Sequence, residues 1–242
     1  MPTAKPATTS RKAPSTRRFS LVSAAAQLEM YRALATLKPS RSTATGSEVA
    51  EIALCLAAGE QNPVILACSA AGARSVRGDC KIVRARERRL TAATLAAIEA
   101  LLHNDQATTA IVCAGKLDTT LKTKLETTEE ARQDCLAAFR FAARHKLGIL
   151  FLVANSLASG QPHPLDLGNL CAGFGIPCFS VDAADAIAAY RVATEALHNA
   201  RHLRGPCVIE ALTLHSPDAA AHRPLDLLAS YMERHGNPPP RL

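Results

Sequence analysis

Two kinds of segment alternate along this chain. Short, mostly apolar runs occupy residues 63–68, 108–113, 149–154, 178–181 and 207–213. Such runs are typical of strands that are covered on both faces, as in a parallel sheet. Longer segments with apolar residues at helical spacing lie before and between them, and these predict amphipathic helices.

Residues that favour helix ends punctuate the pattern. Ser47 is a candidate N-cap with Glu48 in the first turn, and Gly59 is a candidate C-cap. Asp182 and Asp185 precede a long amphipathic helix. We interpret both aspartates as capping residues and not as a catalytic carboxylate pair.

The order of elements predicts the fold class. Five predicted strands alternate with helices after two initial helices, which favours an α/β fold with a parallel sheet and helices on both faces. A chain of 242 residues can bury a full core. We predict a disordered basic tail at 1–18 and a single domain at 19–242.

The positive charge is concentrated at the start of the chain. The formal net charge is +7, and five cations precede the first acid: Lys5, Arg11, Lys12, Arg17 and Arg18. The tail is interpreted as a solvated leader, with an organellar transit peptide ranked lower because no amphipathic helix is evident. No apolar run is long enough to cross a bilayer, so we expect no membrane contact and a cytoplasmic protein.

A second basic region spans residues 72–89, where seven cations accompany Asp79 and Glu87. Charge alone allows it to contact phosphates or nucleic acid. No aromatic side chains are interleaved for base stacking, so a solvated surface loop is favoured.

The eight cysteines form no C-x-x-C motif. Most lie inside apolar runs, which favours buried, reduced thiols that act as small hydrophobic residues. Ligands at the short spacings of a zinc site are missing from the sequence, so no metal ligands are predicted.

Several motifs of the second half occur in a fixed order. They are Phe174–Pro177, Val181-Asp182 with Asp185, Ala200-Arg201, Gly205-Pro206 and Ile209–Ala211 with Thr213. This order resembles the α subunit of the thiamine-diphosphate-dependent dehydrogenase component of 2-oxo acid dehydrogenase complexes, of the pyruvate and branched-chain type. The resemblance implies the thiamine-diphosphate-binding fold.

The resemblance also implies a site. The family holds the cofactor diphosphate through magnesium, using an aspartate after one strand and an asparagine pair after the next. The corresponding positions here are Gly115-Lys116 and Asn155-Ser156, which we predict as cofactor-binding residues, and His215 is the catalytic candidate. Lys116 replaces the carboxylate and Ser156 replaces the second amide.

Three interpretations of these replacements stay open. Asp118 could take the place of the missing carboxylate, or Lys116 could neutralise a diphosphate without a metal. The third interpretation, a degraded loop at the surface, is favoured because two ligands have changed and the family's substrate channel is nearly absent.

The functional hypothesis is therefore a shortened, divergent α-subunit-like component for oxidative decarboxylation of a 2-oxo acid. The resemblance implies a β-subunit-like partner and a lipoyl-bearing acyltransferase that accepts the acyl group. The alternative is a non-catalytic structural or regulatory subunit that keeps the fold and the partner contacts. An anion-binding or nucleic-acid-binding protein is a weaker alternative.

Overall fold

A parallel sheet forms the centre of the molecule. The computed structural model describes residues 20–37, 47–59, 62, 64–66, 72, 76, 82–84, 89–103, 109–116, 126–158, 166–202, 205–215 and 224–240. Within these residues six strands pair in the order β2-β1-β3-β4-β6-β5, and every pair is parallel. The strands are β1 (Val64–Leu66), β2 (Ile82–Arg84), β3 (Ala110–Lys116), β4 (Ile149–Ala158), β5 (Cys178–Asp182) and β6 (Cys207–His215).

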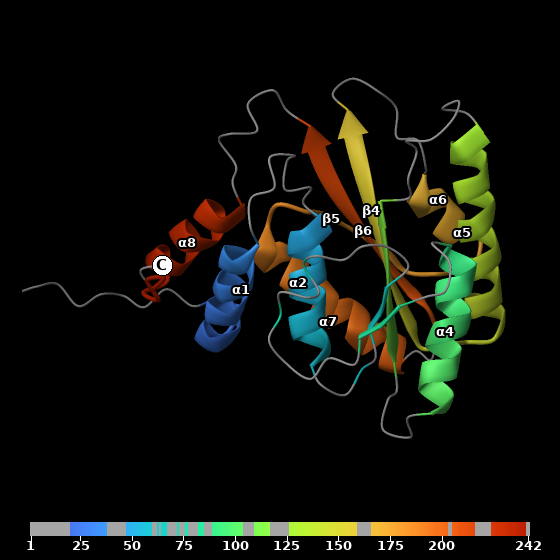
Figure 1. Cartoon of the computed structure of the whole chain (residues 1–242), viewed down its shortest axis with the longest axis horizontal. Coiled ribbons are helices and arrows are strands. Elements are labelled where there is room, and N and C mark those ends of the chain that lie inside the picture. Colours follow the sequence, from blue (N-terminus) through green and yellow to red (C-terminus); the bar gives the residue numbers. More distant parts are fainter. Residues whose placement is uncertain are drawn as a thin grey trace, which may run out of the picture.

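Helices cover both faces of the sheet. Those of the described residues are α1 (Ala24–Thr36), α2 (Ser47–Ala58), α4 (Leu90–Leu102), α5 (Glu126–Arg144), α6 (Leu167–Ala172), α7 (Ala186–His202) and α8 (Pro224–Arg234). Helices α2 and α7 lie on one side of the sheet, with α1 and α8 beyond them, and α4, α5 and α6 lie on the other side (Figure 1). The predicted α/β class with helices on both faces is confirmed.

The central strands separate two hydrophobic clusters, because successive side chains of a strand point to opposite faces. On the α2–α7 side the sheet contributes Ile111, Leu150, Leu152 and Ile209, among others. On the α4–α5–α6 side it contributes Val112, Ile149, Phe151, Val153 and Val208, among others. Phe151 also meets Phe139 of α5 edge to face, with the ring centroids 5.2 Å apart.

The capping predictions are confirmed for Asp185 and Gly59, while the Ser47 cap stays a prediction. Asp185 Oδ1 accepts hydrogen bonds from the backbone N–H groups of Ile187 and Ala188, each at 3.0 Å, at the start of α7. Asp182 Oδ1 accepts from Ala184 N–H at 2.9 Å. Gly59 follows α2 with φ +66°, the left-handed conformation that glycine adopts without a steric cost. Asp185 therefore caps α7 as predicted, whereas Asp182 ends β5 and supports the turn before the helix.

One strand was missed by the sequence prediction. The basic region 72–89 was predicted as a surface loop, yet it contains β2, which pairs with β1 from Val64↔Ile82 to Leu66↔Arg84. Cations surround the short Ile82-Val83 pair in the sequence and obscure its strand pattern. The prediction of a uniform loop is wrong at this point, and most of the other residues of the region lie outside the described residues.

The predicted tail 1–18 also lies outside the described residues, and the single-domain boundary stays a prediction. Across the part of the chain that the structure describes, no helix has both the length and the apolar character that a membrane crossing requires.

Helix α4 receives its N-terminal cap from another helix. Arg89 occupies the N-cap position and gives no side-chain cap hydrogen bond. Instead the Asp134 carboxylate of α5 accepts from Leu90 N–H, from Thr91 N–H at 3.2 Å and from the Thr91 hydroxyl at 2.6 Å. A carboxylate here satisfies backbone donors that the helix leaves unpaired and interacts favourably with the helix dipole.

We therefore expect Asp134→Ala to lower the free energy of unfolding by about 1–2 kcal/mol, the usual cost of losing a helix cap. Urea unfolding followed by circular dichroism measures the change. The matched control is Glu130→Ala, one helical turn earlier in α5, where the side chain is exposed. The control should change stability by less than about 0.5 kcal/mol. Equal losses in the two variants would contradict the cross-helix cap.

Candidate functional site

The site residues predicted from three separate segments lie at one edge of the sheet. Strand β3 contains Gly115-Lys116, β4 contains Asn155-Ser156 and β6 contains His215. These three strands are consecutive in the sheet. The register places Lys116 opposite Ala154, Ser156 opposite Thr213 and Ala158 opposite His215. All five residues thus lie toward the carboxyl ends of parallel strands.

The strand order singles out this edge. The chain places β2 on one side of β1 and β3 on the other, so the direction of winding reverses between β1 and β3. In open α/β sheets, ligands bind in the crevice outside the carboxyl ends of strands at such a reversal. Strand β3 borders this reversal, and Lys116 is its last residue.

The strands extend beyond the apolar runs and include these residues. The apolar run of β4 ends at Ala154, but β4 continues to Ala158 beside β6. Parallel pairing satisfies the backbone groups of Asn155 and Ser156 whatever their side chains are. The pattern of apolar residues therefore does not show that the strand continues through them. The predicted strands, which ended at residues 113, 154 and 213, are therefore too short at their carboxyl ends. Asp118 lies outside the described residues.

His215 lies further out than the other candidates. Lys116 is level with Ala154, and Ala154 pairs with Ala211 of β6, four residues before His215. At the usual rise of a strand this separates the two levels by about 13 Å along the sheet. The topology brings His215 to the same edge as Lys116 but does not place the two backbones side by side.

A buried carboxylate joins three strands just inside this edge. Glu210 Oε1 accepts from Asn155 Nδ2 at 2.9 Å, and Glu210 Oε2 accepts from Ser180 Oγ at 2.8 Å. Both Glu210 and Asn155 are 7% exposed. Hydrogen bonds to a buried charged group are among the stronger ones in proteins. The Asn155 side chain therefore has a structural partner, and its contact with a cofactor stays a prediction.

Sequence reasoning did not assign a role to Glu210. The residue was part of the Ile209–Ala211 motif, but nothing in the sequence showed its partners. The available signal was a single acid in an otherwise apolar strand, since such a residue requires a polar partner once the strand is buried.

Two cysteine thiols lie beside this carboxylate. Cys171 of α6 is buried, and Cys178 of β5 is partly exposed. The neighbouring Cys171 thiol lowers the pKa of Cys178, and the neighbouring Cys178 thiol together with burial raises the pKa of Cys171. The negative charge of Glu210 acts on both thiols and opposes their ionisation.

The residues present do not fit a magnesium–diphosphate site of the kind that the resemblance implies. Magnesium takes hard oxygen ligands, chiefly carboxylates, while a lysine ammonium has only donors. Lys116 stands where the carboxylate is needed, and Ser156 stands where the amide is needed. Within the described part of the chain, no group of three or more His, Cys, Asp and Glu side chains could hold a metal ion.

The fold is that of an open α/β protein with a parallel sheet. Its polar candidate residues lie toward the carboxyl ends of the strands. Residues 130–216 match the model of the dehydrogenase E1 component family, so the resemblance predicted from the sequence is confirmed over this region. The matched region begins within α5 and ends one residue after β6, and it contains the Glu210 bridge.

Two solved structures are similar to the chain. A thiamin diphosphate-dependent enzyme from Mycobacterium smegmatis aligns with 18% identity and a TM-score of 0.49, covering 72% of this chain and 33% of that one. Benzoylformate decarboxylase from Polynucleobacter necessarius aligns with 10% identity and a TM-score of 0.46, covering 73% and 35%. The chain thus spans about a third of the length of either structure. No curated protein matches it.

The Glu210 bridge generates a stability prediction. Glu210→Ala leaves the Asn155 amide buried without this acceptor and removes the partner of Ser180, so we expect a loss of about 2–3 kcal/mol in the free energy of unfolding. Ser180→Ala removes one bond to the same carboxylate at a more exposed position and should cost about 1 kcal/mol.

Urea unfolding measures both changes, and Glu195→Ala on the exposed side of α7 is the matched loss of a carboxylate. This control should change stability by less than about 0.5 kcal/mol. If Glu210→Ala is no more destabilising than Glu195→Ala, the bridge does not hold the three strands together.

Proposed function

We propose that this chain is a dehydrogenase E1 α-like subunit that pairs with a β-type chain of the same family and provides structure or regulation without holding the metal-bound cofactor itself. The supporting observation is a change of residue type at the positions that the resemblance assigns to the metal ligands. Residues 130–216 match the family, but these positions hold Lys116, before the matched region, and Ser156, within it.

Electrostatics favours this proposal. Replacing a ligand carboxylate by a protonated lysine converts an attraction for Mg²⁺ into a repulsion. A serine hydroxyl is also a weaker oxygen ligand than the family's amide. The two changes act in the same direction, and both positions lie toward the carboxyl ends of the neighbouring strands β3 and β4.

A second candidate is a catalytically active subunit. In this candidate Lys116 neutralises the diphosphate of thiamine diphosphate directly, as a point charge, and no magnesium is needed on this chain. The position of Lys116 at the end of β3, beside the reversal in strand order, favours it. The assembly would then decarboxylate a 2-oxo acid and pass the acyl group to a lipoyl-bearing acyltransferase, in the cytoplasm.

Calorimetric titration of thiamine diphosphate, with and without magnesium, distinguishes the two candidates. The titration uses the native chain alone and mixed with the β-type chain encoded in the same genome. The proposal expects no magnesium-dependent heat from the native chain in either sample. It also expects a stable complex of the two chains in size-exclusion chromatography.

Lys116→Asp restores the missing carboxylate and should gain magnesium-dependent binding. Lys146→Asp is the matched control, because Lys146 is an exposed lysine just before β4, toward the opposite edge of the sheet. Tight, magnesium-dependent binding by the native complex would overturn the non-catalytic proposal. Magnesium-independent binding that Lys116→Asp abolishes would establish the second candidate instead.

A further inference from the structure

Two histidines lie one turn apart on the exposed side of α7. His198 and His202 are both exposed, and their ring centroids lie 4.2 Å apart with the ring planes inclined at 43°. Side chains four residues apart on a helix are neighbours on one face. The two imidazole rings therefore form a contacting pair that solvent reaches directly.

The geometry of this pair suits a metal chelate. Zinc binds imidazole nitrogens at about 2.0–2.1 Å, so two such nitrogens in a tetrahedral site lie about 3.3 Å apart. Rings with centroids 4.2 Å apart can bring one nitrogen each to that separation by rotation about their side-chain torsions. The helical H-E-x-x-H motif places two zinc-binding histidines at the same four-residue spacing.

Packing fixes the backbone that carries the pair. The opposite side of α7 is buried in the hydrophobic cluster on the α2 side of the sheet, through Ala193, Ala196, Leu197 and Ala200. The helix cannot rotate without exposing these apolar side chains to water. Two ligands on such a fixed helix lose less conformational freedom on binding a metal than two ligands on separate loops.

The negative groups around the pair favour a cation. His202 is the last residue of α7, where the backbone carbonyl groups of the helix end carry a partial negative charge. The exposed Glu195 side chain lies one turn before His198 on the same stripe of the helix. Both the helix end and this carboxylate attract a positive ion to the two rings.

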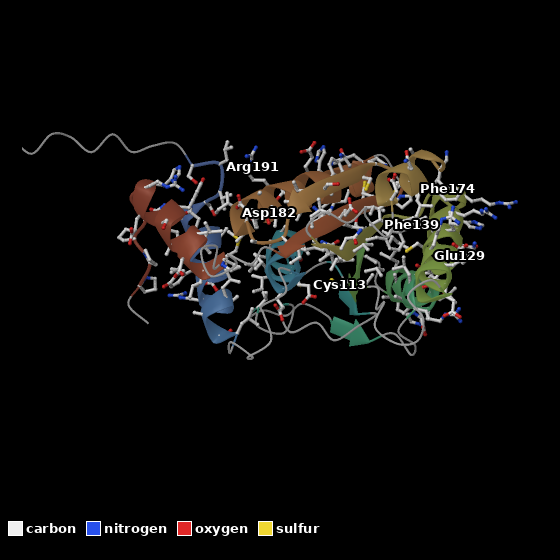
Figure 2. The ribbon with its side chains drawn as sticks, turned by 90° about the horizontal axis from the view of Figure 1, so that it is seen from above. Cys113, Glu129, Phe139, Phe174, Asp182 and Arg191 are labelled. Atoms are coloured by element: carbon white, nitrogen blue, oxygen red, sulfur yellow. The ribbon has the colours of Figure 1, made fainter. Side chains whose placement is uncertain are left out.

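Two exposed arginines of α7 oppose this attraction only weakly. Arg191, at the outer surface of the molecule in Figure 2, precedes His198 by seven residues, about 10 Å along the helix, so salt screens its repulsion. Arg201 is adjacent to His202 in the sequence, but adjacent residues of a helix point about 100° apart. The arginines therefore leave the stripe of the two histidines open.

The ligand type selects the metal. Imidazole nitrogens suit Zn²⁺, Cu²⁺ and Ni²⁺, whereas Mg²⁺ and Ca²⁺ take oxygen ligands. The pair supplies two ligands, in keeping with the lack of any metal-holding group of three or more among the described residues. The prediction of no metal ligands was drawn from the cysteines and did not consider this histidine spacing.

We propose that His198 and His202 form a surface site for a divalent transition-metal ion of the Zn²⁺, Ni²⁺ and Cu²⁺ class, with water in the remaining coordination positions. The inference does not depend on the proposed function. The pair ends the helix that leads into the start of β6, at the opposite edge of the sheet from Lys116, and it takes a different class of metal from Mg²⁺.

The test is calorimetric titration of nickel chloride into the full chain, prepared without a histidine tag. Nickel is the probe because, unlike copper, it does not oxidise cysteine thiols. We expect the native chain to bind Ni²⁺, and His198→Ala and His202→Ala each to weaken this binding about 100-fold or more, because a single imidazole cannot chelate. The double variant should lose no more than either single variant.

His145→Ala is the matched control. His145 is an exposed histidine just after α5, and its ring contacts Phe141 at the same four-residue spacing, with the centroids 4.5 Å apart. A phenyl ring offers no ligand atom, so this control should leave the affinity for Ni²⁺ unchanged. Alanine is the best helix former, and circular dichroism checks that every variant keeps the fold.

Three results would overturn the proposal. The first is a native chain that binds no Ni²⁺. The second is a loss of less than about tenfold in either His198→Ala or His202→Ala, because the two rings would then not act together. The third is an equal loss in His145→Ala, because binding would then not depend on the pair.

Discussion

The structure depends on burial of both faces of the parallel sheet. The central strands β3, β4 and β6 have apolar side chains on each face, so one helix layer could not remove them from water. This constraint explains why α2 and α7 cover one face while α4, α5 and α6 cover the other. Alanine is abundant on the buried side of α7, where small side chains let the helix lie close to its neighbours.

Two carboxylates among the described residues satisfy polar groups of other elements. Glu210 lies on the central strand β6, and its two oxygens take donors from the strands on either side of it. Asp134 satisfies the exposed backbone donors of a helix to which it does not belong. In both cases one carboxylate connects elements that are distant in the sequence, and thus adds specificity to packing that hydrophobic contact alone leaves adjustable.

Resemblance to the family and the chemistry at the carboxyl ends of the strands depend on different residues. Residues 130–216 match the dehydrogenase E1 component family. Within this region, Phe174–Pro177 form a helix ending and Asp185 forms a helix cap. These features preserve the scaffold. Binding of a metal or a diphosphate has a different requirement. It depends on the charge and the ligand type of the residues at the carboxyl ends of the strands, and not on backbone conformation.

The sequence by itself determined the class of fold, the positions of five strands and most helices, and the helix ends formed by Asp185 and Gly59. Each of these features depends on residues close together in the chain, so periodicity and capping preferences record it. Only the tertiary structure decided the strand β2 and the extension of β4 through Asn155 and Ser156. It also placed Lys116 and His215 on β3 and β6, the two strands that flank β4. The partners of Glu210 and Asp134 were decided in the same way. The physical reason is that these polar side chains and backbone groups are satisfied by pairing and burial between distant segments. The sequence around each group does not indicate which distant segment provides its partner.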